Sequence, residues 1–149
     1  MVVYMGENDA TDAEWEPYLE TLKRLAGSKG VRIFSYTEGG RPTREQQQRL
    51  LELELDVWPI AVVSRSTATR FSVSVFALET PAIRLFAPEQ FDEACAYLNC
   101  SAHEVALIQD VLDRAKLAID PSKIAGVAPG PKTAWRGRPF SHEVAPKRR

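Results

Sequence analysis

The stretch VRIFSYTEGGRPTREQQQRL, residues 31–50, decides how the rest of the chain is interpreted. An apolar extended run, residues 31–37, stops at two glycines and a proline. Thr43 then opens a polar segment with Gln46 three residues later, the spacing of a capping box that satisfies free backbone donors at a helix start. The stretch therefore predicts a strand, a turn and a helix that runs to about Leu55.

The residues before this unit predict a strand and a helix. VVYM at residues 2–5 has the apolar character of a short strand. Thr11 with Glu14 forms a second capping box, and the apolar residues after it recur at helical spacing until a glycine at 27 or 30. Pro17 cannot donate a backbone hydrogen bond, so the regular helix either begins nearer Glu14 or bends at the proline.

The residues after the unit contain one ambiguous segment. PIAVVS, residues 59–64, is typical of a buried strand. In RSTATRFSVSVFALETP, residues 65–81, Phe71, Val73 and Val75 alternate with serines as in an exposed strand. Strands on both sides require a crossover, however, and hydroxyl residues at 66, 67 and 69 are available as caps. We therefore expect residues 70–79 to be helical.

The last elements are a strand and two helices. AIRLFA, residues 82–87, predicts the fourth strand, and a helix begins near Pro88. Ser101 with Glu104 is a third capping box, which starts the final helix. The apolar faces of the two helices are Phe91, Ala94, Cys95 and Leu98 in the first, and Val105, Ile108, Val111 or Leu112, Ala115 and Ile119 in the second.

Strands that alternate with helices predict an α/β fold, because parallel strands need crossover connections. We expect one domain over residues 1–119, with four mostly parallel strands and an extra C-terminal helix. Five of the ten prolines lie in residues 120–149, where apolar periodicity ends. That composition predicts a flexible, disordered, basic Pro/Gly-rich tail.

The net charge is negative before the boundary at residue 119 and positive after it. Residues 1–119 hold 12 Lys/Arg and 18 Asp/Glu, a net of −6, whereas residues 120–149 hold 7 and 2, a net of +5. An acidic domain argues against a nucleic-acid role except through the basic tail. We expect no membrane span and no secretory signal. Two cysteines, Cys95 and Cys100, make no disulfide framework, so we expect reduced thiols and a cytoplasmic protein.

Residues that could carry catalysis are few. The two histidines, His103 and His142, lie near no convincing nucleophile, and no His/Asp/Glu cluster has metal-ligand spacing. We expect no enzyme activity, no cofactor and no metal.

The predicted loop between residues 37 and 44 has two interpretations. Gly39 and Gly40, with Arg41 and Arg44, could hold an anion at the helix amino end. Alternatively, the glycines only turn the chain before the Thr43 cap. A second segment also follows a strand and should emerge at the same carboxyl-end edge of the sheet. Its candidate interaction residues are Arg65, Ser66, Thr67 and Arg70.

The tail holds an aromatic pair among arginines. Trp135, Arg136 and Phe140 have no apolar stripe to join. They could form a docking peptide for a protein or a nucleic acid, and an unselected linker is an equal alternative.

With these elements placed, the first 100 or so residues resemble the STAS fold of anti-sigma-factor antagonist domains and their SEC14-like bacterial relatives. The resemblance lies in the order of elements, in the strand that leads through a polar loop into a capped helix, and in PIAVVS after it. It implies a serine or threonine at the second crossover helix that a kinase phosphorylates. Thr43 is the nearest counterpart and Thr37 the second, although the aspartate that the family places before the hydroxyl is absent.

The function that we expect is a non-enzymatic protein-interaction module in bacterial regulatory signalling. Its partner would be another protein or a second copy of the chain, and phosphorylation at a helix cap would switch it. The alternative is a domain that binds a small anion, a nucleotide or a lipid at the same strand-end edge.

The composition of the tail yields a first prediction. Truncation after Ile119 should leave the melting temperature nearly unchanged, because residues 120–149 offer too little apolar surface to offset their ordering entropy. Differential scanning calorimetry of the full and truncated chains measures this. A large drop in melting temperature would show that the tail packs on the domain.

Overall fold

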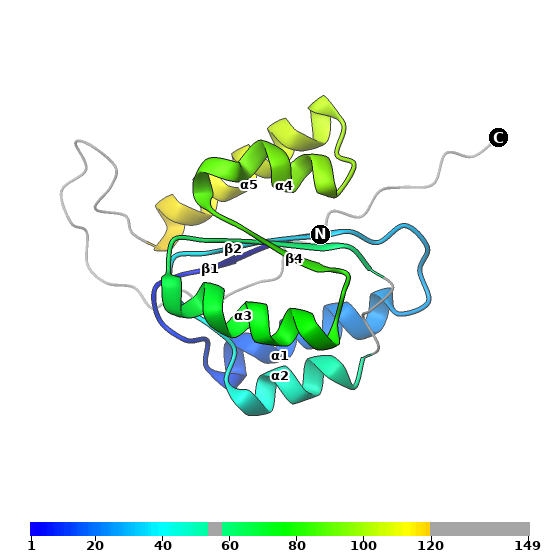
Figure 1. Ribbon diagram of the computed structural model, residues 1–149, viewed down its shortest axis with the longest axis vertical. Helices are drawn as coiled ribbons and strands as arrows, with labels where there is room; N and C mark the ends of the chain where they lie inside the picture. The colour runs from blue at the N-terminus through cyan, green and yellow to red at the C-terminus, as the bar shows by residue number, and fades with distance from the viewer. Residues whose placement is uncertain (54–57, 120–149) are drawn as a thin grey trace.

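A computed structural model describes residues 1–53 and 58–119 (Figure 1). Four strands form one sheet, and each neighbouring pair is parallel. The strands lie in the order in which they occur in the chain, namely β1 (Val2–Met5), β2 (Ile33–Thr37), β3 (Ile60–Ser64) and β4 (Ile83–Phe86). The predicted α/β class and the four strands are confirmed.

The helices cover both faces of the sheet. Three crossover helices, α1 (Asp12–Leu25), α2 (Arg44–Leu51) and α3 (Thr67–Glu79), lie on one face (Figure 1). Because the strands advance across the sheet in one direction, crossovers of one hand place their helices on the same side. The 3₁₀ turn η2 (Pro88–Gln90) leads to α4 (Phe91–Tyr97) and α5 (Ala102–Ile119), which cover the opposite face.

Helix ends follow the predicted caps with two differences. The Thr11–Glu14 capping box is present and α1 begins at Asp12, directly after Thr11, which rules out the first of the two alternatives, a start nearer Glu14. Pro17 lies within the helix. Gly27 follows the end of α1 with a φ of 80°, a left-handed conformation that glycine adopts without steric cost. Helix α2 ends at Leu51, earlier than predicted, and residues 54–57 lie outside the described residues.

The ambiguous segment is a helix, as its position between two strands predicts. The Ser66 hydroxyl accepts a hydrogen bond from the Thr69 N–H and caps α3. The two strands that α3 joins are adjacent and parallel, so the connection must cross a face of the sheet. The alternative of an exposed strand is wrong.

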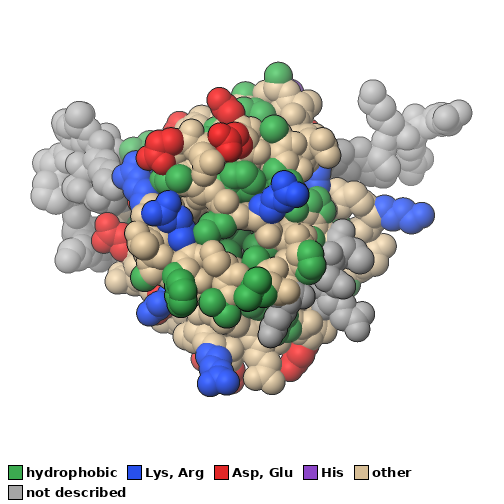
Figure 2. All heavy atoms as spheres, in the orientation of Figure 1, with side chains coloured by type: hydrophobic (Ala, Val, Ile, Leu, Met, Phe, Trp, Pro, Cys, Tyr) green, Lys and Arg blue, Asp and Glu red, His purple; other side chains and the backbone are tan. Residues whose placement is uncertain are grey.

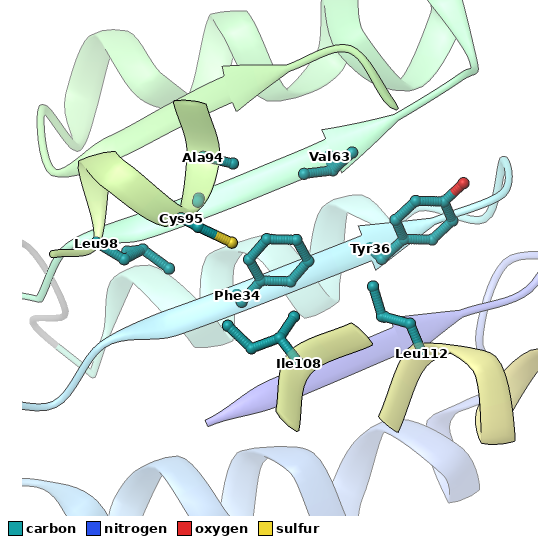
Figure 3. Close-up of a cluster of buried hydrophobic side chains, with 9 residues drawn as sticks. Phe34, Tyr36, Val63, Ala94, Cys95, Leu98, Ile108 and Leu112 are labelled. Atoms are coloured by element: carbon teal, nitrogen blue, oxygen red, sulfur yellow. The ribbon is translucent and has the colours of Figure 1, made fainter. Parts of the chain in front are cut away.

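One hydrophobic core lies between the sheet and helices α4 and α5 (Figure 3). Phe34 and Tyr36 point to this side from β2, and Ile108 and Leu112 contact them from α5. Of the two alternatives for the α5 stripe, Leu112 is 1% exposed and lies in the core, whereas Val111 is 42% exposed. The remaining members are Ala61, Val63, Ala94, Cys95 and Leu98.

A second core lies under α1, α2 and α3. Its fully or nearly buried members are Leu22, Ile33, Trp58, Ile60, Val62 and Ile83. Side chains alternate along a strand, so the residues of β2 that share a face with Ile33 are Ser35 and Thr37. Both are buried, and this face of the central strand is therefore partly polar.

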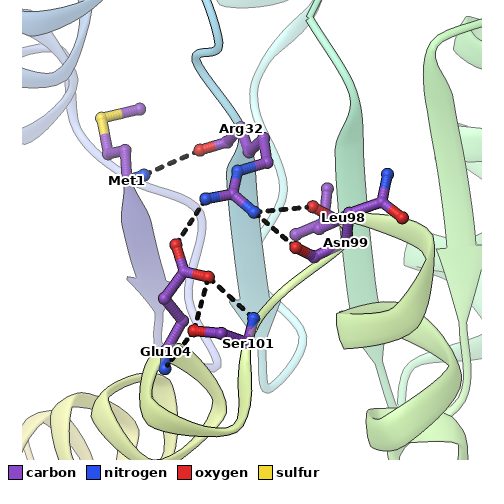
Figure 4. A network of polar contacts seen from close by, with 6 residues as sticks. All are labelled: Met1, Arg32, Leu98, Asn99, Ser101 and Glu104. Atoms are coloured by element: carbon purple, nitrogen blue, oxygen red, sulfur yellow. Dashed lines mark hydrogen bonds and ion pairs between the residues drawn. The ribbon is translucent and has the colours of Figure 1, made fainter.

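A polar network ties the start of β2 to the turn between α4 and α5 (Figure 4). The Arg32 guanidinium donates to the carbonyl oxygens of Leu98 at 3.0 Å and Asn99 at 2.8 Å. It also forms an ion pair with Glu104. The amino group of Met1 donates to the Arg32 carbonyl at 2.7 Å, which joins the start of β1 to the same cluster.

The network predicts a pH dependence of stability. The Ser101 N–H and hydroxyl donate to Glu104, and these bonds, with Arg32, hold the pKa of that carboxyl below its usual 4.5. A depressed folded-state pKa adds stability above the unfolded-state pKa that is lost as the pH falls through the folded value. Between about pH 5 and pH 3, the melting temperature of the Glu104→Gln variant should therefore fall less than that of the wild type. Identical acid profiles of the two proteins would contradict the assignment.

Candidate functional site

The loop after β2 packs against the loop after β1 at the carboxyl end of the sheet. The Gly40 N–H donates to the Gly6 carbonyl at 2.9 Å, and the Arg41 N–H donates to the Asp9 carboxylate at 3.0 Å. The Gly39 N–H donates to the Thr37 hydroxyl at 3.2 Å. The backbone N–H groups of residues 39, 40 and 41 are therefore engaged within the chain.

Gly40 is required by the closeness of the two loops. A Cβ atom at this position would lie 2.2 Å from the Asn8 carbonyl oxygen and 2.9 Å from that of Gly6. This geometry supports the structural interpretation of the two glycines, and anion binding by Arg41 and Arg44 at the start of α2 stays a prediction.

The two candidate phosphoacceptors have different surroundings. Thr43 is exposed, and its hydroxyl accepts from the Gln46 N–H at 3.2 Å while the Gln46 side chain accepts from the Thr43 N–H at 3.0 Å. The predicted capping box is thus present. Thr37 is fully buried and its hydroxyl donates to the Gly40 carbonyl, so a kinase has no access to it in this structure.

Gln46 joins the starts of α1 and α2. The residue is 1% exposed, and its side-chain amide donates to the Ala10 carbonyl at 3.1 Å and the Asp12 carboxylate at 2.9 Å. An ion pair between Arg49 and Glu16 at 2.8 Å connects the same helices further along. Polar contacts therefore join helices α1 and α2 at two places, at their amino ends and further along.

The second predicted segment meets the loop after β2, as expected from its place at the same edge. The Thr69 hydroxyl donates to the Gly39 carbonyl at 2.9 Å. Ser66 caps α3, and the Thr67 hydroxyl accepts from the Arg70 guanidinium at 3.5 Å. The arginine side chains differ in exposure: those at 41, 44 and 65 are exposed, and that at 70 is half-buried.

An apolar surface on α3 is a feature that the sequence reasoning missed. The outer face of the helix holds Phe71, Val75 and Leu78, which are 72%, 53% and 83% exposed. Their spacing of four and three residues places them on one side of the helix. Figure 2 shows hydrophobic side chains gathered on the front of the molecule, over α3. The sequence did contain a signal for this surface. The segment has more apolar residues than one face of a helix can bury, so some of them must be exposed.

A cavity under the crossover helices was also missed. It has a volume of about 280 Å³ and lies between the sheet and helices α1, α2 and α3. The available signal was Ser35, a hydroxyl residue in the middle of a strand that is otherwise apolar on both sides.

Burial also affects titratable groups outside the predicted site. Burial raises the pKa of the Cys95 thiol to about 11, which keeps it protonated. Burial, with the neighbouring Glu38 carboxylate, raises the pKa of Tyr4 to about 12. His103 is exposed in the first turn of α5.

The predicted tail site, Trp135, Arg136 and Phe140, lies outside the described residues, as does His142. Within residues 1–53 and 58–119, no group of three or more His, Cys, Asp or Glu side chains is arranged to hold a metal ion. In the same part of the chain, no helix combines the length and apolar character that crossing a membrane requires.

Comparison with known protein families, with curated proteins and with solved structures finds no match in any of the three. The STAS-like resemblance therefore stays a prediction from the order and character of the elements.

The loop contact yields a prediction about stability. Gly40→Ala should lower the free energy of unfolding by about 2 kcal/mol or more, because the new methyl group must separate two packed backbones. Gly6→Ala is the matched control: its Cβ would meet only the Ile119 side chain, at 3.7 Å, and the change should stay below about 1 kcal/mol. Chemical denaturation measures both, and equal losses would refute the close approach.

Proposed function

We propose that the chain is a non-enzymatic protein-interaction module whose docking surface is the outer face of α3. The observation that carries the proposal is the exposure of Phe71, Val75 and Leu78 on one side of a single helix. A contiguous exposed apolar surface on a helix is typical of a face that a partner covers. The setting that we propose is regulatory signalling, as the STAS-like resemblance implies.

Covering the outer face of α3 costs little desolvation free energy, because its serine hydroxyls are already hydrogen-bonded within the helix. The Ser72 hydroxyl donates to the Ala68 carbonyl at 3.1 Å, and the Ser74 hydroxyl donates to the Arg70 carbonyl at 2.8 Å. Hydroxyls that already bond to their own helix lose little when water is removed. From Thr67 to Leu78 the helix carries one ionisable side chain, Arg70, so a partner need not desolvate several charges.

The charges beside the surface indicate the chemistry of the partner. Arg65 and Arg70 stand at the amino end of α3, and Arg41 and Arg44 belong to the loop that Thr69 contacts. The partner that fits is an amphipathic helix with apolar residues at matching intervals and carboxylates at one end. Phosphorylation of Thr43 would add negative charge to this basic edge and would weaken the binding of such a partner.

The proposal predicts which helical peptides the protein selects. A displayed library of amphipathic helices, selected against the wild type and counter-selected against a Phe71→Ser/Leu78→Ser double variant, should enrich acidic sequences with apolar residues at i, i+4 and i+7. Leu78→Ser alone should weaken binding at least about tenfold, since an apolar anchor is removed. Fluorescence anisotropy measures the affinities.

The matched control is Leu107→Ser, which makes the same change at a half-exposed leucine of α5, on the opposite face of the sheet. Its affinity should equal that of the wild type, and neither serine variant should alter the melting temperature much. Equal affinity of the two variants would remove α3 as the docking surface. Concentration-dependent dimerisation that Leu78→Ser abolishes, measured by light scattering, would instead identify a second copy as the partner and overturn the proposal.

A further inference from the structure

The cavity under the crossover helices is lined mainly by apolar side chains. Ile60 and Val62 of β3 form part of its floor, and Leu50 of α2 and Phe76 of α3 form part of its walls. Its volume of about 280 Å³ suits one small molecule and is too small for a lipid with two acyl chains.

Polar groups of three buried residues lie at this cavity, and one of these groups is buried without a hydrogen-bond partner among the described residues. Trp15 is 4% exposed, and its indole N–H is buried without an acceptor. Ser35 and Thr80, which are 7% and 5% exposed, add two hydroxyl groups to the lining. All three side chains line the cavity. A buried polar group without a partner is destabilising, so the Trp15 N–H, with two hydroxyl groups at the same cavity, favours a bound solute that carries a hydrogen-bond acceptor.

An exposed arginine, Arg41, is among the residues that line the cavity. Arg41 is the single ionised side chain among its described lining residues, because burial raises the pKa of the Tyr18 phenol to about 12 and keeps it neutral. The Arg41 guanidinium forms no ion pair within residues 1–53 and 58–119. Its backbone N–H is fixed by Asp9, which anchors the residue at the carboxyl-end edge of the sheet. An anionic group at that end would therefore find a charge-assisted donor.

We propose that this cavity binds a small carboxylic acid that has an apolar body and one further hydrogen-bonding oxygen. The carboxylate pairs with Arg41, the apolar body lies among the side chains of the cavity, and the second oxygen bonds to the buried groups at Ser35 and Trp15. The aromatic walls, Trp15, Tyr18 and Phe76, suit a ring, and an alkyl chain of similar volume has the same chemistry apart from stacking. The site is independent of the docking surface, because Phe71, Val75 and Leu78 do not line it.

A panel of acids tests the proposal on the full chain. 4-Hydroxyphenylacetate carries both polar groups, phenylacetate lacks the second oxygen, and 8-hydroxyoctanoate replaces the ring with an alkyl chain. At a concentration 100-fold above its Kd, the best ligand should raise the melting temperature by about 5 °C or more. Titration calorimetry gives the affinities, and 4-hydroxyphenylacetate should bind at least about fivefold more tightly than phenylacetate. Tighter binding of the alkyl acid would assign the apolar body to a chain rather than a ring.

Two variants separate the site from general stability. Ser35→Ala removes a hydroxyl that has no hydrogen-bond partner among residues 1–53 and 58–119, so the unliganded protein should melt at the same temperature or slightly higher. The same change should weaken binding of 4-hydroxyphenylacetate about fivefold and leave phenylacetate unaffected. A purely structural role of Ser35 would give the opposite result, namely a lower melting temperature and equal loss for both acids.

Arg41→Gln should lower the affinity for every acid in the panel about tenfold, because the charge-assisted contact is lost. Arg44→Gln is the matched control, an exposed arginine of the same loop that does not line the cavity, and it should bind as the wild type does. Equal effects of the two arginine variants, or no binding of any acid in the panel, would overturn the proposal. Binding of helical peptides to α3 is measured separately, so failure here leaves the proposed function standing.

Discussion

The structure depends on the pairing of β2 with β3, two parallel strands whose ten residues are all buried. Parallel pairing requires crossover helices, and burial of both strands requires that both faces be covered. The two faces meet this requirement differently. Helices α4 and α5 bring Leu98, Ile108 and Leu112 into close contact with Phe34 and its neighbours. On the other face, small polar residues of β2 stand opposite three helices that leave a cavity between them.

Most of the fold could be predicted from the sequence because its signals are local. Each capping box that was identified by spacing is present, at Thr11, Thr43 and Ser101, because the bonds that form it join residues only three apart. The end of α2 was predicted too late, since the alternating residues after Leu51 resemble helix formers and no glycine marks the stop. The start of α1 was placed in doubt by Pro17, whose missing N–H the helix tolerates.

The candidate site could be predicted only in part, because its decisive contacts join residues far apart in the chain. The loop that contains Gly40 follows β2. The acceptors for its Gly40 and Arg41 N–H groups are the Gly6 carbonyl and the Asp9 carboxylate, about thirty residues earlier in the chain. The outer face of α3 arises from a conflict between pattern and topology. A period-two sequence that the sheet forces into a helix distributes its apolar residues over both sides, with Val73 and Phe76 inside and Phe71 and Leu78 outside. Such conflicts between local pattern and fold tend to mark functional surfaces.

The helices around the cavity are held in place by different kinds of contact. Helix α2 is bound to α1 through Gln46 at one end and through Arg49 further along. Helix α3 is attached to the neighbouring loop by the Thr69–Gly39 bond at its amino end. Displacing α2 would break several charged or buried bonds, whereas displacing α3 would disturb the apolar packing of Val73, Phe76 and Ala77 on the sheet. A solute that enlarged the interior would therefore be opposed by directional polar bonds at α2 and mainly by non-directional apolar contacts at α3.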